Sequence, residues 1–197
     1  MKLRAFAIVA ALALPALASA DDKTPTTDKT TDKTTDNAAK LSADEVKVIA
    51  HLHHVNQQEI DLGKIAQKSG TTHVKSYGDT LEKDHKSADA DLTAFAKKHG
   101  LKSIPADKPD TDAERQEQKD LTASVAHLKT LRGAEFDKEF LNIVVTGHEK
   151  EIGRVDAALN ATSDQDFQAL LKSVKPMLQR HLDEARDLQK SPQANAN

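Results

Sequence analysis

Three histidines of this 197-residue chain occupy positions at which a helix would place them among apolar side chains. His85, His148 and His181 each fill the one gap in a run of apolar residues spaced three or four apart, which is the spacing of a single helix face. Glu59 fills the corresponding gap in an earlier run. Imidazoles and carboxylates on facing helices are the groups that bind transition metals inside helical bundles. These four residues and Glu82 are therefore candidate metal ligands.

The spacing of these residues suggests that they converge. Glu82 precedes His85 by three residues, so a helix directs both side chains to the same side. At a rise of about 1.5 Å per residue, Glu59 and Glu82 are nearly level across the turn that separates them. By the same rise, His148 and His181 are offset by about 4.5 Å across theirs. If two helical hairpins pack with matching ends, the sequence predicts one internal polar layer.

Three interpretations of this layer are open. It binds a transition metal, which would be iron, manganese or zinc, because imidazole and carboxylate are its only ligands. Alternatively, it is a metal-free polar network that fixes how the helices pack. As a third possibility, buried histidines become charged in acid, which would make the layer a pH sensor. No catalytic residue is predicted, because the chain has no cysteine, no G-x-S-x-G motif and no glycine-rich phosphate loop.

Helical patterns run through most of the chain from residue 43 onward. Ser42 with Glu45, and Thr111 with Glu114, are capping-box pairs that predict helix starts. Gly70 is expected to end the first helix in the left-handed conformation. The predicted helices span about 43–69, 72–99, 112–132, 135–160 and 165–190. Pro176 lies inside the last of them, so we expect a kink or a restart there.

The fold class that these elements predict is all-α. Valine and isoleucine do not alternate with polar residues over the length of a strand, so no sheet is expected. Four long helices form two hairpins, and the connection between them, residues 100–133, carries a short extra helix. This is the plan of a ferritin-like, up-down four-helix bundle with a long crossover.

The chain divides into four parts by composition. Residues 1–20 have the basic start, apolar centre and small-residue end of a signal peptide. Residues 21–40 repeat threonine, aspartate and lysine, which predicts a disordered linker. Residues 41–190 form the helical domain, and residues 191–197 form a disordered tail. We therefore expect a periplasmic or secreted protein with no transmembrane helix after cleavage.

Composition also limits the partners. A net charge of -3 and the absence of tryptophan argue against binding to nucleic acid. The absence of cysteine excludes disulfides and thiolate metal sites. No partner protein is predicted, and we expect a monomer or a weak homo-oligomer.

Four stretches carry a resemblance to a known family: "QQEIDLGKIAQK", the pair Asp84-His85, "LRGAEFDKEFLNIVVTGHEKEI" and "PMLQRHLDEA". Over most of residues 41–190 the chain resembles a family of exported bacterial proteins catalogued as domain of unknown function 4142. The resemblance implies a ferritin-like fold without a settled activity. Gly147-His148 departs from the Asp-His pair that this family often shows. The function expected is envelope metal handling or an oxidative-stress role, and the alternative is a non-enzymatic structural or interaction protein.

Overall fold

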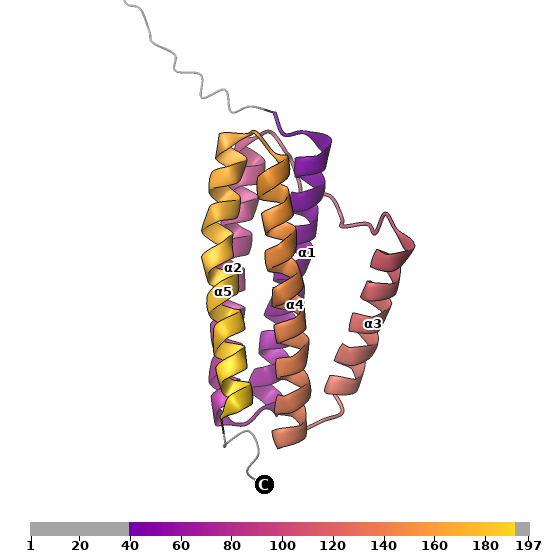
Figure 1. Ribbon diagram of the computed structural model, residues 1–197, viewed down its shortest axis with the longest axis vertical. Coiled ribbons are helices and arrows are strands. Elements are labelled where there is room, and N and C mark those ends of the chain that lie inside the picture. Colours follow the sequence, from indigo (N-terminus) through magenta and orange to yellow (C-terminus); the bar gives the residue numbers. More distant parts are fainter. Residues whose placement is uncertain (1–39, 192–197) are drawn as a thin grey trace, which may run out of the picture. The chain divides into compact units, whose positions relative to one another are not determined.

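The structure is a computed structural model and describes residues 40–191, which form five α-helices and no strand (Figure 1). The helices are α1 (Ala43–Ser69), α2 (Thr72–Lys98), α3 (Asp112–Leu128), α4 (Gly133–Ala161) and α5 (Gln165–Lys190). The predicted all-α class is confirmed. The predicted signal peptide, nearly all of the predicted linker and the tail beyond Ser191 lie outside the described residues. Within residues 40–191, no helix combines the length and the apolar character needed to cross a membrane.

Two antiparallel hairpins, α1–α2 and α4–α5, pack against each other, with α1 against α4 and α2 against α5. Figure 1 shows α3 on the outside of these four helices, and its packing partner is α4. Because α3 returns the chain along the length of the other helices, α4 starts at the same end as α2 (Figure 1). The long connection with an extra helix is therefore present.

The interior contains two clusters of buried apolar side chains. The first includes Tyr77, Leu81, Phe136, Phe140, Val144 and Ala185. The second includes Ile49, Leu52, Leu92, Val155, Phe167 and Leu178. Along α2, His85 lies between Leu81 and Leu92, and His148 and His181 hold equivalent positions on α4 and α5. The three histidines thus lie where the two apolar clusters meet.

Most predicted helix ends agree with the structure. The Ser42 and Thr111 capping boxes form, and Gly100 ends α2 with φ of 86°. The left-handed conformation predicted for Gly70 is wrong, because its φ is -76° and its ψ is 169°. Extended backbone at Gly70 leads directly to Thr71, whose N–H donates to Asp137 Oδ1 at 3.0 Å. That contact with α4 orients the turn.

The predicted end of α3 needed correction, and of the two outcomes predicted at Pro176 the restart is excluded. α3 ends at Leu128 instead of continuing to about residue 132. The reason is local, because the Thr130 hydroxyl and the Arg132 guanidinium bind carbonyl oxygens at this end, those of His127 and Lys129 among them. α5 continues through Pro176, so the helix does not restart there.

α1 and α2 approach each other closely at two glycines. A Cβ atom on Gly63 would lie 2.5 Å from the Gly78 carbonyl oxygen, and one on Gly78 would lie 2.6 Å from Ala66 Cβ. The two backbones can therefore lie this close only because neither residue has a side chain. The crossing lies within two helical turns of Asn56 and His85, and so sets the spacing of the helices where those residues meet.

We expect Gly63→Ala to lower the free energy of unfolding by about 1–3 kcal/mol, since the added methyl group overpacks a backbone contact. Gly153→Ala is the matched control, because Gly153 is an exposed residue of α4 where an added Cβ atom would meet no atom of another described element within 4 Å. There the better helix propensity of alanine is expected to raise stability by about 0.5–1 kcal/mol. Urea unfolding measures both, and a Gly63→Ala variant as stable as the control would contradict the close approach.

Candidate functional site

His85, His148 and His181 come together in the interior from α2, α4 and α5. Their side chains are almost wholly buried, with exposed fractions of 0%, 1% and 1%. Each offers one ring nitrogen, and these nitrogens all lie within 4.8 Å of one another. We call these three residues the histidine cluster.

The outer ring nitrogens of His148 and His181 face groups that can only accept hydrogen bonds. His148 Nδ1 lies 3.0 Å from the Val144 carbonyl oxygen, one helical turn earlier. His181 Nε2 lies 3.0 Å from Asp84 Oδ2 on α2. A carbonyl or carboxylate oxygen requires a donor, so each of these nitrogens carries the ring proton. In the neutral rings, the other nitrogen of each histidine then holds a lone pair.

His85 follows the same pattern with a side-chain amide. Its Nδ1 lies 2.9 Å from Asn56 Oδ1 on α1, and this oxygen accepts the hydrogen bond. Its Nε2 is buried and has no hydrogen-bond partner within residues 40–191. The cluster therefore presents three lone-pair nitrogens, each on a ring that an outer hydrogen bond orients. That pairing of an inner ligand nitrogen with an outer N–H donor is usual for histidines that bind metals.

The inner nitrogens of His148 and His181 are the closest pair. His148 Nε2 and His181 Nδ1 are separated by 3.3 Å. With both outer protons in place, neither of these atoms can donate to the other. A tetrahedral ion with metal–nitrogen bonds of 2.0–2.1 Å would separate two ligand nitrogens by about 3.3 Å. The distance therefore suits a shared cation.

Burial keeps the three rings uncharged. It lowers the pKa of His148 to about 3, and repulsion from His181, were both rings protonated, lowers it further. The pKa of His85 is well below its usual value because of burial and of the two other histidines. Burial also lowers the pKa of His181, although the hydrogen bond to Asp84 opposes this. At neutral pH all three nitrogens are therefore free of protons and able to act as ligands.

Glu59 lies beside the cluster, on its outer side. Its side chain is buried, and Oε1 is 3.8 Å from His148 Nδ1, the nitrogen that points away from the other two histidines. Burial, together with the charge of Glu151, raises the pKa of Glu59 to about 8. Its carboxyl group is not among the atoms that converge in the cluster.

Glu82 does not face the cluster. Its Oε2 accepts from Gln67 Nε2 and its Oε1 accepts from Lys86 Nζ, both at 2.5 Å. The spacing of three residues rotates Glu82 about 60° away from His85 around the helix axis. That rotation is enough to direct it toward α1 and solvent, where Lys86 balances its charge.

A family model described as "Domain of unknown function (DUF4142)" matches residues 30–188. This chain belongs to that family. The resemblance noted in the sequence is thereby confirmed. No curated protein and no solved structure matches the chain.

Two residues that orient the cluster in this DUF4142 chain, Asn56 and Asp84, were not among the predicted site residues. Asp84 directly precedes His85, yet on the helix it points to α5 and binds a different histidine, His181. Asn56 lies three residues before Glu59, on the same face of α1. A buried polar residue one turn from a predicted ligand is the signal that would have identified Asn56.

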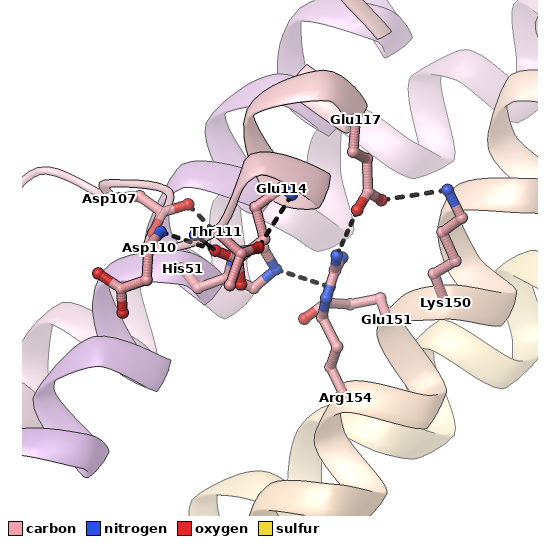
Figure 2. A network of polar contacts seen from close by, with 9 residues as sticks. All are labelled: His51, Asp107, Asp110, Thr111, Glu114, Glu117, Lys150, Glu151 and Arg154. Carbon is pink, nitrogen blue, oxygen red and sulfur yellow. Dashed lines mark hydrogen bonds and ion pairs between the residues drawn. The ribbon is translucent and has the colours of Figure 1, made fainter. Parts of the chain in front are cut away.

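A second polar network holds the crossover and α3 onto the other helices (Figure 2). On α1, His51 Nδ1 lies 3.1 Å from Asp107 Oδ2. The other ring nitrogen, Nε2, lies 3.0 Å from Glu151 Oε2. Two carboxylates on two ring nitrogens favour the doubly protonated ring. Although burial disfavours its charge, the hydrogen bonds to Glu151 and Asp107 outweigh that effect and raise the pKa of His51. Arg154 on α4 completes the network by binding Glu117 of α3 at 2.8 Å.

Acidification from about pH 6 to about pH 5 is expected to destabilise the metal-free protein. In the folded protein His85 and His148 are unprotonated in this range. In the unfolded chain they titrate near their ordinary pKa of 6.5, so unfolding lets each of them bind a proton. Glu59 releases one proton on unfolding because its pKa is about 8 in the fold, and His51 is protonated in both states. The net uptake averages about one proton over this interval, so the free energy of unfolding falls by about 1 kcal/mol per pH unit. Denaturant unfolding across this interval measures the slope, and a flat or rising stability would contradict it.

Proposed function

We propose that this protein binds a divalent transition metal ion through His85, His148 and His181, and that it handles metal in the cell envelope. The observation that carries the proposal is the 3.3 Å separation of two inner nitrogens, His148 Nε2 and His181 Nδ1, that both hold lone pairs when the rings are neutral. A proton between them would put a positive charge in the core, and burial opposes that charge more strongly than the Asp84 carboxylate favours it. A metal ion between them uses both lone pairs.

The ligand set favours one ion over two. Glu59 and Glu82 do not join the cluster, and the di-iron and di-manganese sites of ferritin-like bundles depend on such carboxylates. Three imidazoles suit zinc or iron better than manganese, which prefers oxygen ligands. Three protein ligands also leave a fourth position for water or a small ligand. Zinc is therefore the first ion to test, and iron the second.

We further propose that the protein has a ferritin-like fold and that it is exported. Two hairpins joined by a long crossover, with α2 and α4 starting at the same end, support this fold. The signal-like composition of residues 1–20 supports export to the periplasm or beyond. A role in storing or buffering metal, or in limiting metal-dependent oxidation, follows from a buried site of this kind.

The purified protein is expected to bind one zinc ion per chain in competition with a chromophoric chelator. His148→Ala is expected to weaken binding by about 100-fold or more, because it removes a ligand that touches the ion. His127→Ala is the control and should leave affinity unchanged, since His127 is an exposed residue of α3. If the wild type and a His85→Ala/His148→Ala double variant take up zinc, iron and manganese equally, the cluster is a metal-free structural layer.

Asp84→Asn tests how the cluster is oriented. The carboxylate of Asp84 holds the proton on His181 Nε2 and so leaves Nδ1 to the metal. An amide in its place weakens that preference, and zinc affinity is expected to fall about 10- to 100-fold. Asp89→Asn is the matched control on the same helix, because Asp89 also binds a histidine, His53, but lies outside the cluster. Equal affinities for the two variants would contradict a role for Asp84 in positioning the ring.

A further inference from the structure

A cavity of about 790 Å³ lies between α1, residues 105–110, α3 and α4. Its lining is mainly apolar and includes Val55, Leu121, Ile143 and Val155. Cavities of a few hundred to about 1,000 Å³ with apolar walls and few polar groups are typical of small-molecule sites. The cavity exists because α3 lies to one side of the other helices instead of packing fully against them (Figure 1).

Several charged side chains around this cavity are already paired. His51 binds both Asp107 and Glu151, and Arg154 binds both Glu151 and Glu117 (Figure 2). These contacts join α1, the crossover, α3 and α4, so they hold the wall in place without needing a ligand. The surface that remains available to a ligand is therefore mainly the apolar interior of the cavity.

Among the described polar side chains that line the cavity, Glu59 is the one with a fully buried atom that lacks a hydrogen-bond partner. It lines the cavity with 7% of its surface exposed, and its Oε2 has no hydrogen-bond partner among the described residues. Its Oε1 is 3.8 Å from His148 Nδ1, beyond hydrogen-bond distance. A buried polar atom without a partner is costly and rare in folded proteins. A ligand group that hydrogen-bonds to this carboxyl would remove that cost.

We propose that the cavity binds a mainly apolar small molecule that carries a hydroxyl group, with the hydroxyl bound to the Glu59 carboxyl group. A hydroxyl both donates and accepts, so it pairs with this group in either protonation state. The apolar body of the ligand contacts the walls formed by α1, α3 and α4. The site is separate from the proposed metal site, which it touches only through His148, and it needs no metal to form.

The test uses two probes of nearly equal shape on chelator-treated, metal-free protein. 2-Naphthol carries the hydroxyl, and 2-methylnaphthalene carries a methyl group in its place. Fluorescence titration is expected to show saturable binding of 2-naphthol, about tenfold tighter than that of 2-methylnaphthalene, because only the first forms the hydrogen bond. Glu59→Leu is expected to abolish this preference, and Glu59→Gln to retain part of it.

Val55→Trp fills the cavity one helical turn before Glu59 and is expected to weaken 2-naphthol binding at least about tenfold. Val174→Trp is the matched control, since Val174 is also half-buried but lies on α5 and does not line the cavity. Circular dichroism checks that each variant folds. The comparison of the two probes on the wild-type protein does not depend on any variant.

Three results would overturn the proposal. One is the absence of saturable 2-naphthol binding to the wild type, and another is equal affinity for the two probes. The third is a wild-type dimer that is detected by sedimentation and that the Val55→Trp substitution dissociates. Such a result would show that the cavity wall is a subunit interface. Because metal is absent throughout, none of these results depends on whether the histidine cluster binds zinc.

Discussion

A neutral imidazole has one N–H and one lone pair, and burying three such rings together imposes the constraint on which this interior depends. Each N–H must find an acceptor, and in this chain each does so on the outer side: Val144 for His148, Asp84 for His181 and Asn56 for His85. Those three hydrogen bonds leave the lone pairs facing one another. Two of the hydrogen bonds join α1 to α2 and α2 to α5, and the contacts of the His148 ring with His85 and His181 add α4, so the polar layer helps to align the four helices.

α1 supplies no histidine to the cluster but determines much of its surroundings. The close approach of Gly63 and Gly78 brings its backbone against α2, which lets Asn56 reach His85. On the same face, Glu59 lies between the outer nitrogen of His148 and the cavity under α3. The cluster and the cavity therefore share one boundary, formed by a buried carboxyl group and the back of one imidazole ring.

The charged network at the crossover explains why a cavity can persist there. α3 has one fully buried residue, Leu128 near its end, so apolar packing holds it at that end alone. Further along, the ion pairs of Glu117 with Lys150 and Arg154 connect it to α4. Long charged side chains bridge a gap that apolar side chains would close. The open side of the molecule is thus a consequence of which residues connect α3 to the rest.

The sequence by itself determined the helices and the inward position of the histidines, because capping boxes and spacings of three or four residues are local properties. Only the tertiary structure decided that Glu82 turns away, that Asp84 binds His181 and that Gly70 is extended, because each depends on the rotation and register of a helix against its neighbours. Glycine contacts and buried acceptors far apart in the chain set that rotation. Which ring nitrogen faces the interior is therefore a property of the assembled fold.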